Sequence, residues 1–306
     1  MPFVVRDPWR LQYFENIPCP ADVIIPIDDI DCWDVWPDLR FIYDKLFIAQ
    51  SQKLACGTVH DMPQEFPVFA KPRINLHGMG EGSFAVSSEN EFRARMTDEH
   101  IWMQLLRGDH VSTDCAVVDG TVAWICHAKG ETWDGGMFKF WTIEAAANPH
   151  LSAFLSGWIK HYLPNHTGMV NIETIGGKII EAQLRFADQW CDLNGAGWLN
   201  AVAGLYGNGT WKFHNAATAN AYSIPLFMRH GPPPKHPAPD IQAAIRAMPG
   251  ISSLQITFHE GKPDEGHTMP PGGFRLAVIN AWDRAAGMTA RNALAKAFPD
   301  CDVMLP

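Results

Sequence analysis

The segment from Val170 to Arg185, VNIETIGGKIIEAQLR, constrains the fold of this chain more than any other. Two apolar runs flank the pair Gly176-Gly177, which predicts two antiparallel strands joined by a tight turn. Charged side chains lie within these runs, although a charge in a buried sheet is costly unless a partner compensates it. The segment therefore predicts a hairpin whose polar face binds ions.

The polar residues of this hairpin indicate which ions it binds. Glu173, Glu181 and Gln183 offer oxygen ligands that suit a divalent cation, which leaves Arg185 for an anion, and this combination points to phosphate chemistry. A two-residue turn would place the two glutamates on opposite faces, because side chains alternate along a strand. We therefore expect a loop with an odd number of residues, such as 175–177. A solvated edge strand is the alternative.

Composition limits the classes of protein to consider. The chain has 306 residues, 47% of them hydrophobic, which is enough for one large core or two to three subdomains. Its net charge of -9 and the lack of a Lys/Arg run disfavour a nucleic acid partner. No apolar run approaches the ~20 residues that span a bilayer, and no signal-peptide pattern is present, so we expect a cytoplasmic protein without membrane contact. Seven cysteines without a C-x-x-C pair suggest neither disulfides nor zinc.

Periodicity and turn residues predict a mixed α+β chain. A helix is expected over residues 38–52 and a hairpin over residues 111–126. Residues 127–141 are expected to form a glycine- and tryptophan-rich loop, followed by a helix over residues 149–162. The proline-rich stretch 231–240 predicts a linker or a surface strap.

A second candidate site follows the apolar strand that ends near Lys71. The loop beyond it contains Gly78, Gly80, Gly82 and Ser83. Glycines let backbone N–H groups approach phosphate oxygens without interference from a Cβ, and Lys71 adds a positive charge. A surface loop beside a surface lysine is the alternative. The pattern is not a Rossmann fingerprint, since no helix opens directly after the loop, nor that of a protein kinase, in which the glycine loop precedes the lysine.

Taken in order, these segments resemble the ATP-grasp superfamily, in particular its carboxylate–amine ligase and biotin-carboxylase-like branch. The residues that carry the resemblance are Asp44-Lys45, Val68 to Pro72, Trp102 to Gly108, Asp114, and Glu173 with Glu181, Gln183 and Arg185. They span about residues 20 to 205, and the order of the motifs carries the resemblance more than any one of them. The C-terminal stretch GGFRLAVIN and the alanine-rich helix after it resemble the last subdomain of that branch.

The resemblance implies an α+β ATP-grasp fold, in which two α/β subdomains with antiparallel sheets clasp a nucleotide and a small C-terminal α/β subdomain follows. The implied divisions are an abridged N-terminal segment (1–50), a core (51–205) made of a lid and hinge part (51–108) and a metal-site part (109–205), and a C-terminal subdomain (206–306). The first segment is shorter than the N-terminal domain of that branch. The second substrate would then meet an open cleft or a partner subunit, and a homodimer is one arrangement that would supply it.

The resemblance also implies ATP as the nucleotide and Mg²⁺ (or Mn²⁺) as its ion. Contacts with ATP are implied for Lys45, Lys71, Gly78, Gly80, Gly82, Ser83, Gln104, Leu105, Leu106, His110 and Asp114. The lysines would contact the phosphates, the glycine loop would cover them as a lid, and the residues from Gln104 to Leu106 would bind adenine. The implied metal ligands are Glu173, Glu181 and Gln183. His110 stands where many members have a ribose-binding glutamate, and Gln183 where the family usually has asparagine.

The implied activity is that of an ADP-forming ligase. A substrate carboxylate would attack the γ-phosphate of ATP to give an acyl phosphate, which an amine or a thiol would then capture. Arg185 and Lys71 are the implied catalytic residues, with Arg185 against the acceptor carboxylate or the acyl phosphate. If the chain is a ligase, the loop residues Lys129, Trp133, Gly135, Gly136 and Lys139 would bind a carboxylate or the acyl phosphate, and an aromatic surface loop is the alternative. A catalytically weak nucleotide-binding module that works through a partner, and a phosphotransferase on the same fold, stay open as alternatives.

Overall fold

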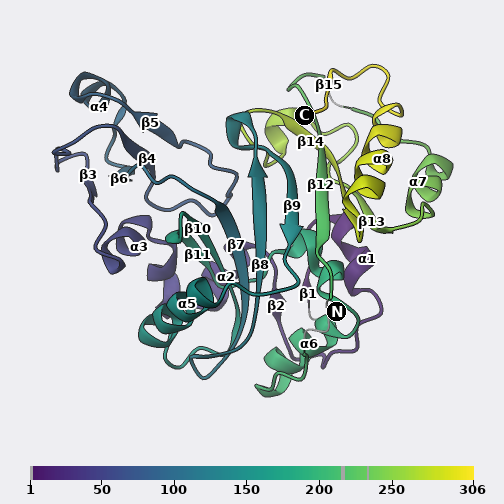
Figure 1. Cartoon of the computed structure of the whole chain (residues 1–306), viewed down its shortest axis with the longest axis horizontal. Helices are drawn as coiled ribbons and strands as arrows, with labels where there is room; N and C mark the ends of the chain where they lie inside the picture. The colour runs from purple at the N-terminus through teal and green to yellow at the C-terminus, as the bar shows by residue number, and fades with distance from the viewer. Residues whose placement is uncertain (1–2, 215–217, 233) are drawn as a thin grey trace.

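The longest strands of the chain form one central sheet (Figure 1). The computed structural model describes residues 3–214, 218–232 and 234–306. In this part of the chain the sheet has nine strands, in the order β11-β10-β7-β8-β9-β12-β14-β13, with β15 paired to β12. Their bounds are β7 (His110–Val118), β8 (Thr121–Thr132), β9 (Phe138–Ile143), β10 (Gly168–Ile175), β11 (Lys178–Gln183), β12 (Ala221–Met228), β13 (Ile251–Ile256), β14 (Phe274–Ala281) and β15 (Val303–Met304). Its neighbouring strands pair antiparallel, as the predicted α+β class requires.

A smaller antiparallel sheet lies at the left of Figure 1. Its strands are β3 (Cys56–Thr58), β4 (Val68–Pro72), β5 (Phe84–Val86) and β6 (His100–Gln104), in the order β3-β6-β4-β5. Helix α4 (Glu89–Arg95) covers this sheet with Phe92. The helix begins with a variant of the capping box, because Ser88 accepts the N–H of Glu91 while Glu91 accepts the N–H of Ser87, the residue before the cap. Strand β4 pairs with β5, so the glycine loop after Lys71 joins the two strands of a hairpin.

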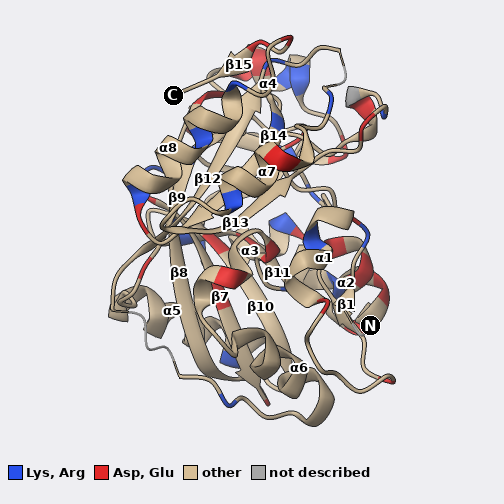
Figure 2. Ribbon diagram, turned by 90° about the vertical axis from the view of Figure 1, so that its right-hand side faces the viewer, with Lys and Arg blue, Asp and Glu red and all other residues tan. Residues whose placement is uncertain are grey.

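The remaining elements surround the central sheet. They are the parallel pair β1 (Phe3–Val4) and β2 (Ile25–Pro26), and the helices α1 (Leu11–Phe14), α2 (Asp29–Val35), α3 (Lys45–Ser51), α5 (Pro149–Tyr162), α6 (Trp198–Asn208), α7 (Pro239–Arg246) and α8 (Arg284–Ala295). Figure 2 shows α6 in tan throughout, since it carries no charged residue, whereas acidic residues gather on α2. None of the helices in the described ranges is long and apolar enough to cross a membrane.

Helices α5 and α6 pack on opposite faces of β7 and β10. Asn148 caps α5, and Leu155 and Ile159, four residues apart, lie on its buried face against the sheet. Burial of each such side chain contributes about 2 kcal/mol to folding. On the other face, Trp198 and Val202 of α6 pack against a second cluster. The sheet is thus covered on both sides.

Two predicted elements are wrong in detail. The expected helix over 38–52 is interrupted at Asp44, because the 3-10 helix η2 (Pro37–Tyr43) ends there and the extended Asp44 caps α3 with its carboxylate. The expected loop 127–141 is mostly strand, since β8 continues to Thr132 and β9 begins at Phe138. Glycine and tryptophan composition suggested a loop, but the tryptophan at 141 is a core residue.

The C-terminal strands extend the central sheet, because β12 pairs with β9. The predicted boundaries at residues 50, 108 and 205 are not tested by this arrangement and stay a prediction. Within the proline-rich stretch 231–240, residue 233 lies outside the described residues, and α7 begins at Pro239.

The turn between β10 and β11 contacts the connection between the two sheets. The N–H of Gly176 donates to the carbonyl of Asp109, and a Cβ on Gly176 would lie 2.2 Å from the carbonyl oxygen of Arg107. We expect Gly176→Ala to lower the free energy of unfolding by about 1–3 kcal/mol, through this clash and the positive φ. Gly177→Ala is the matched control, since its φ is also positive but its Cβ would meet nothing within 4 Å. Equal losses in urea denaturation of the two variants would contradict the contact.

Candidate active site

A cavity of about 680 Å³ lies where the two sheets, the N-terminal segment and the C-terminal strands meet. Its wall includes Lys71 of β4, Gln104 of β6, Glu173 of β10, Arg185 just after β11, and Arg275 of β14. Thirteen of the fifteen residues predicted from the sequence line this cavity, and the other two, Gly82 and Asp114, do not. Residues from distant parts of the chain are therefore brought to one space.

The hairpin of β10 and β11 differs from its predicted geometry. Its loop consists of the two residues Gly176 and Gly177, so the expected odd-numbered loop is wrong. A β-bulge nevertheless leaves Ile180 as an extra residue in β11, and one extra residue turns all later side chains to the opposite face. Glu173 consequently pairs directly opposite Glu181. Directly opposed side chains share a face, with Cβ atoms about 4.5–5.5 Å apart.

A sequence signal for this bulge exists. The buried residues on the opposite face are Ile179 and Ala182 of β11 and Leu184 directly after it. Strict alternation would give spacings of two, whereas the first spacing is three. That interval predicts one inserted residue between Ile179 and Ala182, which is where the structure has it.

The predicted metal ligands form one polar group. The Nε2 of Gln183 donates to Glu181 Oε1 at 2.6 Å, and His110 Nε2 lies 2.8 Å from Glu173 Oε2. Burial acts to raise the pKa of Glu173, but the hydrogen bond and the charge of His110 outweigh it, so the pKa is lowered. No group of three His, Cys, Asp or Glu side chains suited to a metal occurs among the described residues.

The amide oxygen of Gln183 supports a cation at this place. Gln183 Oε1 is buried and has no hydrogen-bond partner among the described residues. A buried acceptor without a donor is costly, and a divalent cation compensates it as well as the two carboxylates beside it. Glu173, Glu181 and Gln183 therefore fit Mg²⁺ or Mn²⁺, with the amide in place of a third acid.

Two buried lysines face these acids. Lys45, the first residue of α3, is 7% exposed, and its Nζ lies 3.3 Å from Glu181 Oε2. Lys71 is 5% exposed, and its Nζ donates to the carbonyl of Ile180, the bulged residue, at 2.7 Å. Burial and the charge of Lys45 lower the pKa of Lys71 to about 8. A cation at a helix N-terminus is unfavourable, so Lys45 opposes the helix dipole, as residues at functional sites often do.

The glycine loop between β4 and β5 lies beside these lysines. Gly78, Gly80 and Ser83 line the cavity, and both glycines have positive φ. Gly82 instead packs against Pro72, since a Cβ there would lie 2.9 Å from the proline ring. The loop thus presents part of its backbone to the cavity, beside Lys71 at the end of β4.

The predicted adenine edge and sugar contact also reach the cavity. Gln104, Leu105 and Leu106 line it, together with the apolar side chains of Phe69 and Met103. An apolar slot with an exposed backbone edge suits a flat heteroaromatic ring. His110 lies in the wall as well, edge-on to two aromatic rings.

Asp114 lies below the cavity rather than in its wall. It is buried, and its Oδ1 accepts hydrogen bonds from Asn171 Nδ2 at 2.8 Å and from the N–H of Ala187 at 2.9 Å. Burial raises its pKa to about 6. Asp114 therefore orients Asn171, which does line the cavity and which the sequence reasoning missed. The sequence could have indicated Asn171, because it lies two residues before Glu173 in β10 and therefore on the same face of the strand.

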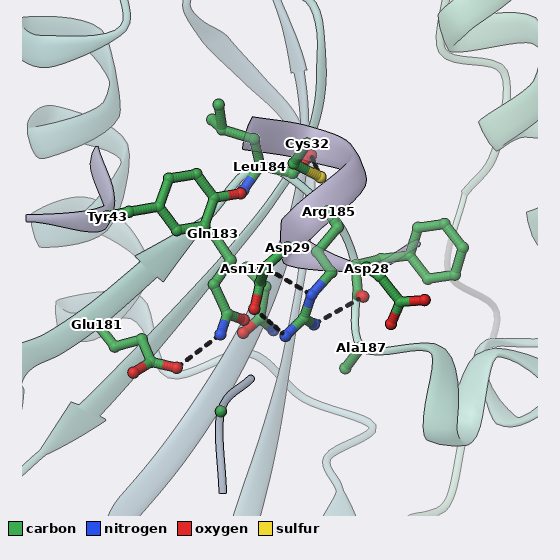
Figure 3. A network of polar contacts seen from close by, with 12 residues as sticks. Asp28, Asp29, Cys32, Tyr43, Asn171, Glu181, Gln183, Leu184, Arg185 and Ala187 are labelled. Carbon is green, nitrogen blue, oxygen red and sulfur yellow. Dashed lines mark hydrogen bonds and ion pairs between the residues drawn. The ribbon is translucent and has the colours of Figure 1, made fainter. Parts of the chain in front are cut away.

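Arg185 has a partner that the sequence did not predict. Figure 3 shows its guanidinium against Asp29 of α2, with Nε and Nη2 donating at 2.8 and 3.0 Å. Nη1 donates to the carbonyl of Phe186, which leaves one N–H on each terminal nitrogen. Burial raises the pKa of Asp29 to about 6, although the charge of Arg185 acts in the opposite direction. Arg185 is thus held in place and can still donate two hydrogen bonds.

The two lysines expected near the acceptor do not line the cavity. Lys129 pairs with Asp109 at 2.8 Å, and Lys139 lies 3.9 Å from Glu131. The acceptor contacts predicted for these two lysines have no counterpart in this arrangement, although Thr132, Trp133 and Gly136 from the same segment do line the cavity.

Comparison with solved structures identifies the fold. An L-amino acid ligase from Bacillus licheniformis superposes with a TM-score of 0.64 at 11% identity, over 97% of this chain and 83% of that one. N5-carboxyaminoimidazole ribonucleotide synthetase from Thermus thermophilus gives 0.57 at 15% identity, over 86% and 74%. The carboxyaminoimidazole ribonucleotide synthase of Aspergillus clavatus, complexed with ATP, gives 0.56 at 10%, also over 86% and 74%.

These neighbours are ATP-grasp carboxylate–amine ligases. No family model matches the sequence, and no curated protein matches it either. At such low identity the likeness concerns the fold, and the predicted resemblance is confirmed at that level: this chain has the ATP-grasp fold.

Proposed function

We propose that this protein is an ATP-dependent ligase that activates a substrate carboxylate as an acyl phosphate, releases ADP, and transfers the acyl group to an amine or a thiol. The observation that carries the proposal is the meeting of two buried lysines with two directly opposed glutamates in one cavity. Such a cluster is expensive without a ligand that has its own negative charges and a cation. A nucleoside triphosphate with its metal ion meets that requirement.

The nucleotide would lie with its base against Gln104 to Leu106 and its phosphates against Lys45 and Lys71. The backbone of Gly78 and Gly80 would donate to the phosphate oxygens. Glu173, Glu181 and Gln183 would hold Mg²⁺ or Mn²⁺, which neutralises phosphate charge. Support for the nucleotide comes from the ATP and ADP complexes among the structural neighbours.

The chemistry then requires mainly positioning and charge neutralisation. An oxygen of the substrate carboxylate bonds to the γ-phosphorus, and the bond from that phosphorus to the β–γ bridging oxygen breaks, with ADP as the leaving group. Lys71 and Lys45 offset the charge that moves onto the phosphate oxygens. Arg185, oriented by Asp29, directs its two remaining N–H groups to the acyl phosphate. The amine or thiol attacks the acyl carbon, loses a proton and expels inorganic phosphate.

Hydroxylamine trapping tests this proposal. The protein, ATP and Mg²⁺ are incubated with pools of carboxylates, and ADP and acyl hydroxamate are both measured. Equal amounts of each show that an acyl phosphate forms, because hydroxylamine captures it in place of the natural amine. In a second incubation without hydroxylamine, a ligase transfers the acyl group to an added amine or thiol, whereas ADP and acyl phosphate that accumulate without this transfer would indicate a phosphotransferase. Nucleotide binding in thermal shift without any turnover would indicate a nucleotide-binding module that works through a partner.

The pKa of Lys71 predicts how nucleotide affinity depends on pH. Below pH 8 the ammonium of Lys71 is charged before ATP binds, so we expect a constant affinity. Above that pH the free protein must take up a proton on binding, and the affinity falls by up to about tenfold per pH unit. Calorimetric titration with ADP from pH 6.5 to 9.5 measures this. Lys71→Arg should give a flat profile, and an equally steep fall in this variant would contradict the assignment to Lys71.

A further inference from the structure

The cavity extends past Arg185 to the N-terminal segment and β14, where its arginines differ in their partners. Four arginines line the whole cavity: Arg6, Arg10, Arg185 and Arg275. Arg6 pairs with Asp31 and Arg185 with Asp29, while Arg10 has three carboxylates, those of Asp7, Asp28 and Asp188, within 4 Å. In the described residues, no carboxylate lies within 4 Å of Arg275.

Arg275 is nevertheless enclosed. Its Nη1 donates to Gln189 Oε1 at 3.3 Å, and its Nε is buried with no hydrogen-bond partner. Burial and the charge of Arg10 lower the pKa of Arg275 to about 10, although the charges of Asp188 and Asp7 act in the opposite direction. Gln189 is itself fixed, because its Nε2 donates to Ser223 Oγ at 3.0 Å. A guanidinium that is held in place, desolvated and without a carboxylate within 4 Å is suited to bind an anion.

This end of the cavity is separate from the nucleotide groups but close to Arg185. Strand β14 lies five places from β10 in the sheet, so Arg275 does not belong to the lysine and glutamate cluster. Gln189, whose Oε1 accepts from Arg275, follows Arg185 by four residues, and all three side chains line the same cavity. A molecule whose carboxylate lies against Arg185 can therefore extend toward Arg275 within this cavity.

We propose that Arg275 binds a second anionic group, a carboxylate or a phosphate monoester, on the substrate that is activated. The proposal rests on the acyl-phosphate function above and adds the substrate class: a small molecule with two anionic ends. Arg185 faces the end that reacts, and Arg275 holds the end that does not.

Three matched probes distinguish the possibilities. Propionate has one carboxylate, succinate adds a second, and 3-phosphonopropionate adds a phosphonate that resembles a phosphate monoester. Each is titrated by calorimetry into the protein with and without saturating ADP and Mg²⁺. We expect succinate or 3-phosphonopropionate to bind about tenfold or more tightly than propionate, as hydrogen bonds to a charged group allow. The compound with the higher affinity shows whether Arg275 prefers a carboxylate or a phosphate monoester.

The variant Arg275→Gln should remove this advantage. Its melting temperature without ligand should equal or exceed that of the wild type, because a buried charge without a partner is lost. The control is Arg291→Gln on α8, where a buried arginine also has unpartnered nitrogens but lies outside the cavity. The Arg291→Gln variant should still bind the probe with two anionic groups more tightly than propionate.

An equal affinity for the three probes in the wild type, or an advantage that persists in Arg275→Gln, would overturn the proposal. The titrations without ADP test the anion site at Arg275 independently of the proposed ATP-dependent ligase activity. Anion binding at Arg275 without any ADP binding would leave this site intact and refute the ligase.

Discussion

Replacement of Glu181 by glutamine is expected to lower ADP formation by about 10²- to 10³-fold, the largest loss predicted for a change of so few atoms. Glu181 lies directly opposite Glu173, its Oε2 is 3.3 Å from Lys45 Nζ, and its Oε1 accepts from Gln183. The substitution keeps the shape of the side chain but removes one of the two negative charges that would hold the cation. Lys45 would also lose its only carboxylate within 4 Å in the described residues.

A coupled assay of ADP release at increasing Mg²⁺ measures the effect. The half-saturating Mg²⁺ concentration should rise together with the loss in rate. The control is Glu91→Gln in the exposed capping box of α4, where glutamine can still accept the N–H of Ser87. If Glu181→Gln released ADP at the rate of this control, the metal-site interpretation of the hairpin would fail.

Replacement of Lys71 by methionine is expected to weaken ATP binding by about 100-fold. The ammonium is almost fully buried, and its hydrogen bond goes to the carbonyl of Ile180 rather than to a carboxylate. Burial already disfavours its charged form, so methionine should leave the unfolding midpoint without nucleotide at or above that of the wild type. Weaker binding without loss of stability is the signature of a residue kept for its ligand.

Calorimetry with ADP and urea denaturation together check this result. Lys178→Met serves as the control, since Lys178 is an exposed lysine on the same hairpin, at the start of β11. It should bind ADP as the wild type does. If Lys71→Met lost stability and kept its affinity, Lys71 would be a structural residue and the nucleotide would have to bind elsewhere.

Local patterns in the sequence predicted much of the fold. The helix over 149–162 and the hairpin of β7 and β8 follow from apolar spacing, capping residues and turn chemistry, all of which act over a few residues. The same logic failed at Asp44, where capping by a side chain interrupts a helical pattern, and at Ile180, where one inserted residue reverses the alternation. Both errors come from single residues that break a period.

Part of the site was also predictable. The hairpin of Glu173 and Glu181, the glycine loop and Lys71 were apparent because charged residues and glycines interrupt apolar strands. Asp29 and Arg275 had no such signal. Asp29 contacts Arg185 across 156 positions of sequence. The role proposed for Arg275 rests on its unpartnered Nε and on the lack of a carboxylate within 4 Å in the described residues.

The sequence by itself determined the strand and helix pattern, the polar face of the hairpin and the resemblance to ATP-grasp proteins, because these depend on residue type and short spacing. Only the tertiary structure decided which charges meet: Lys45 with Glu181, and Arg185 with Asp29. It also left Arg275 without a carboxylate within 4 Å in the described part of the chain. The physical reason is that a charge is stable or costly according to its neighbours and its burial, and both are properties of packing between elements far apart in sequence.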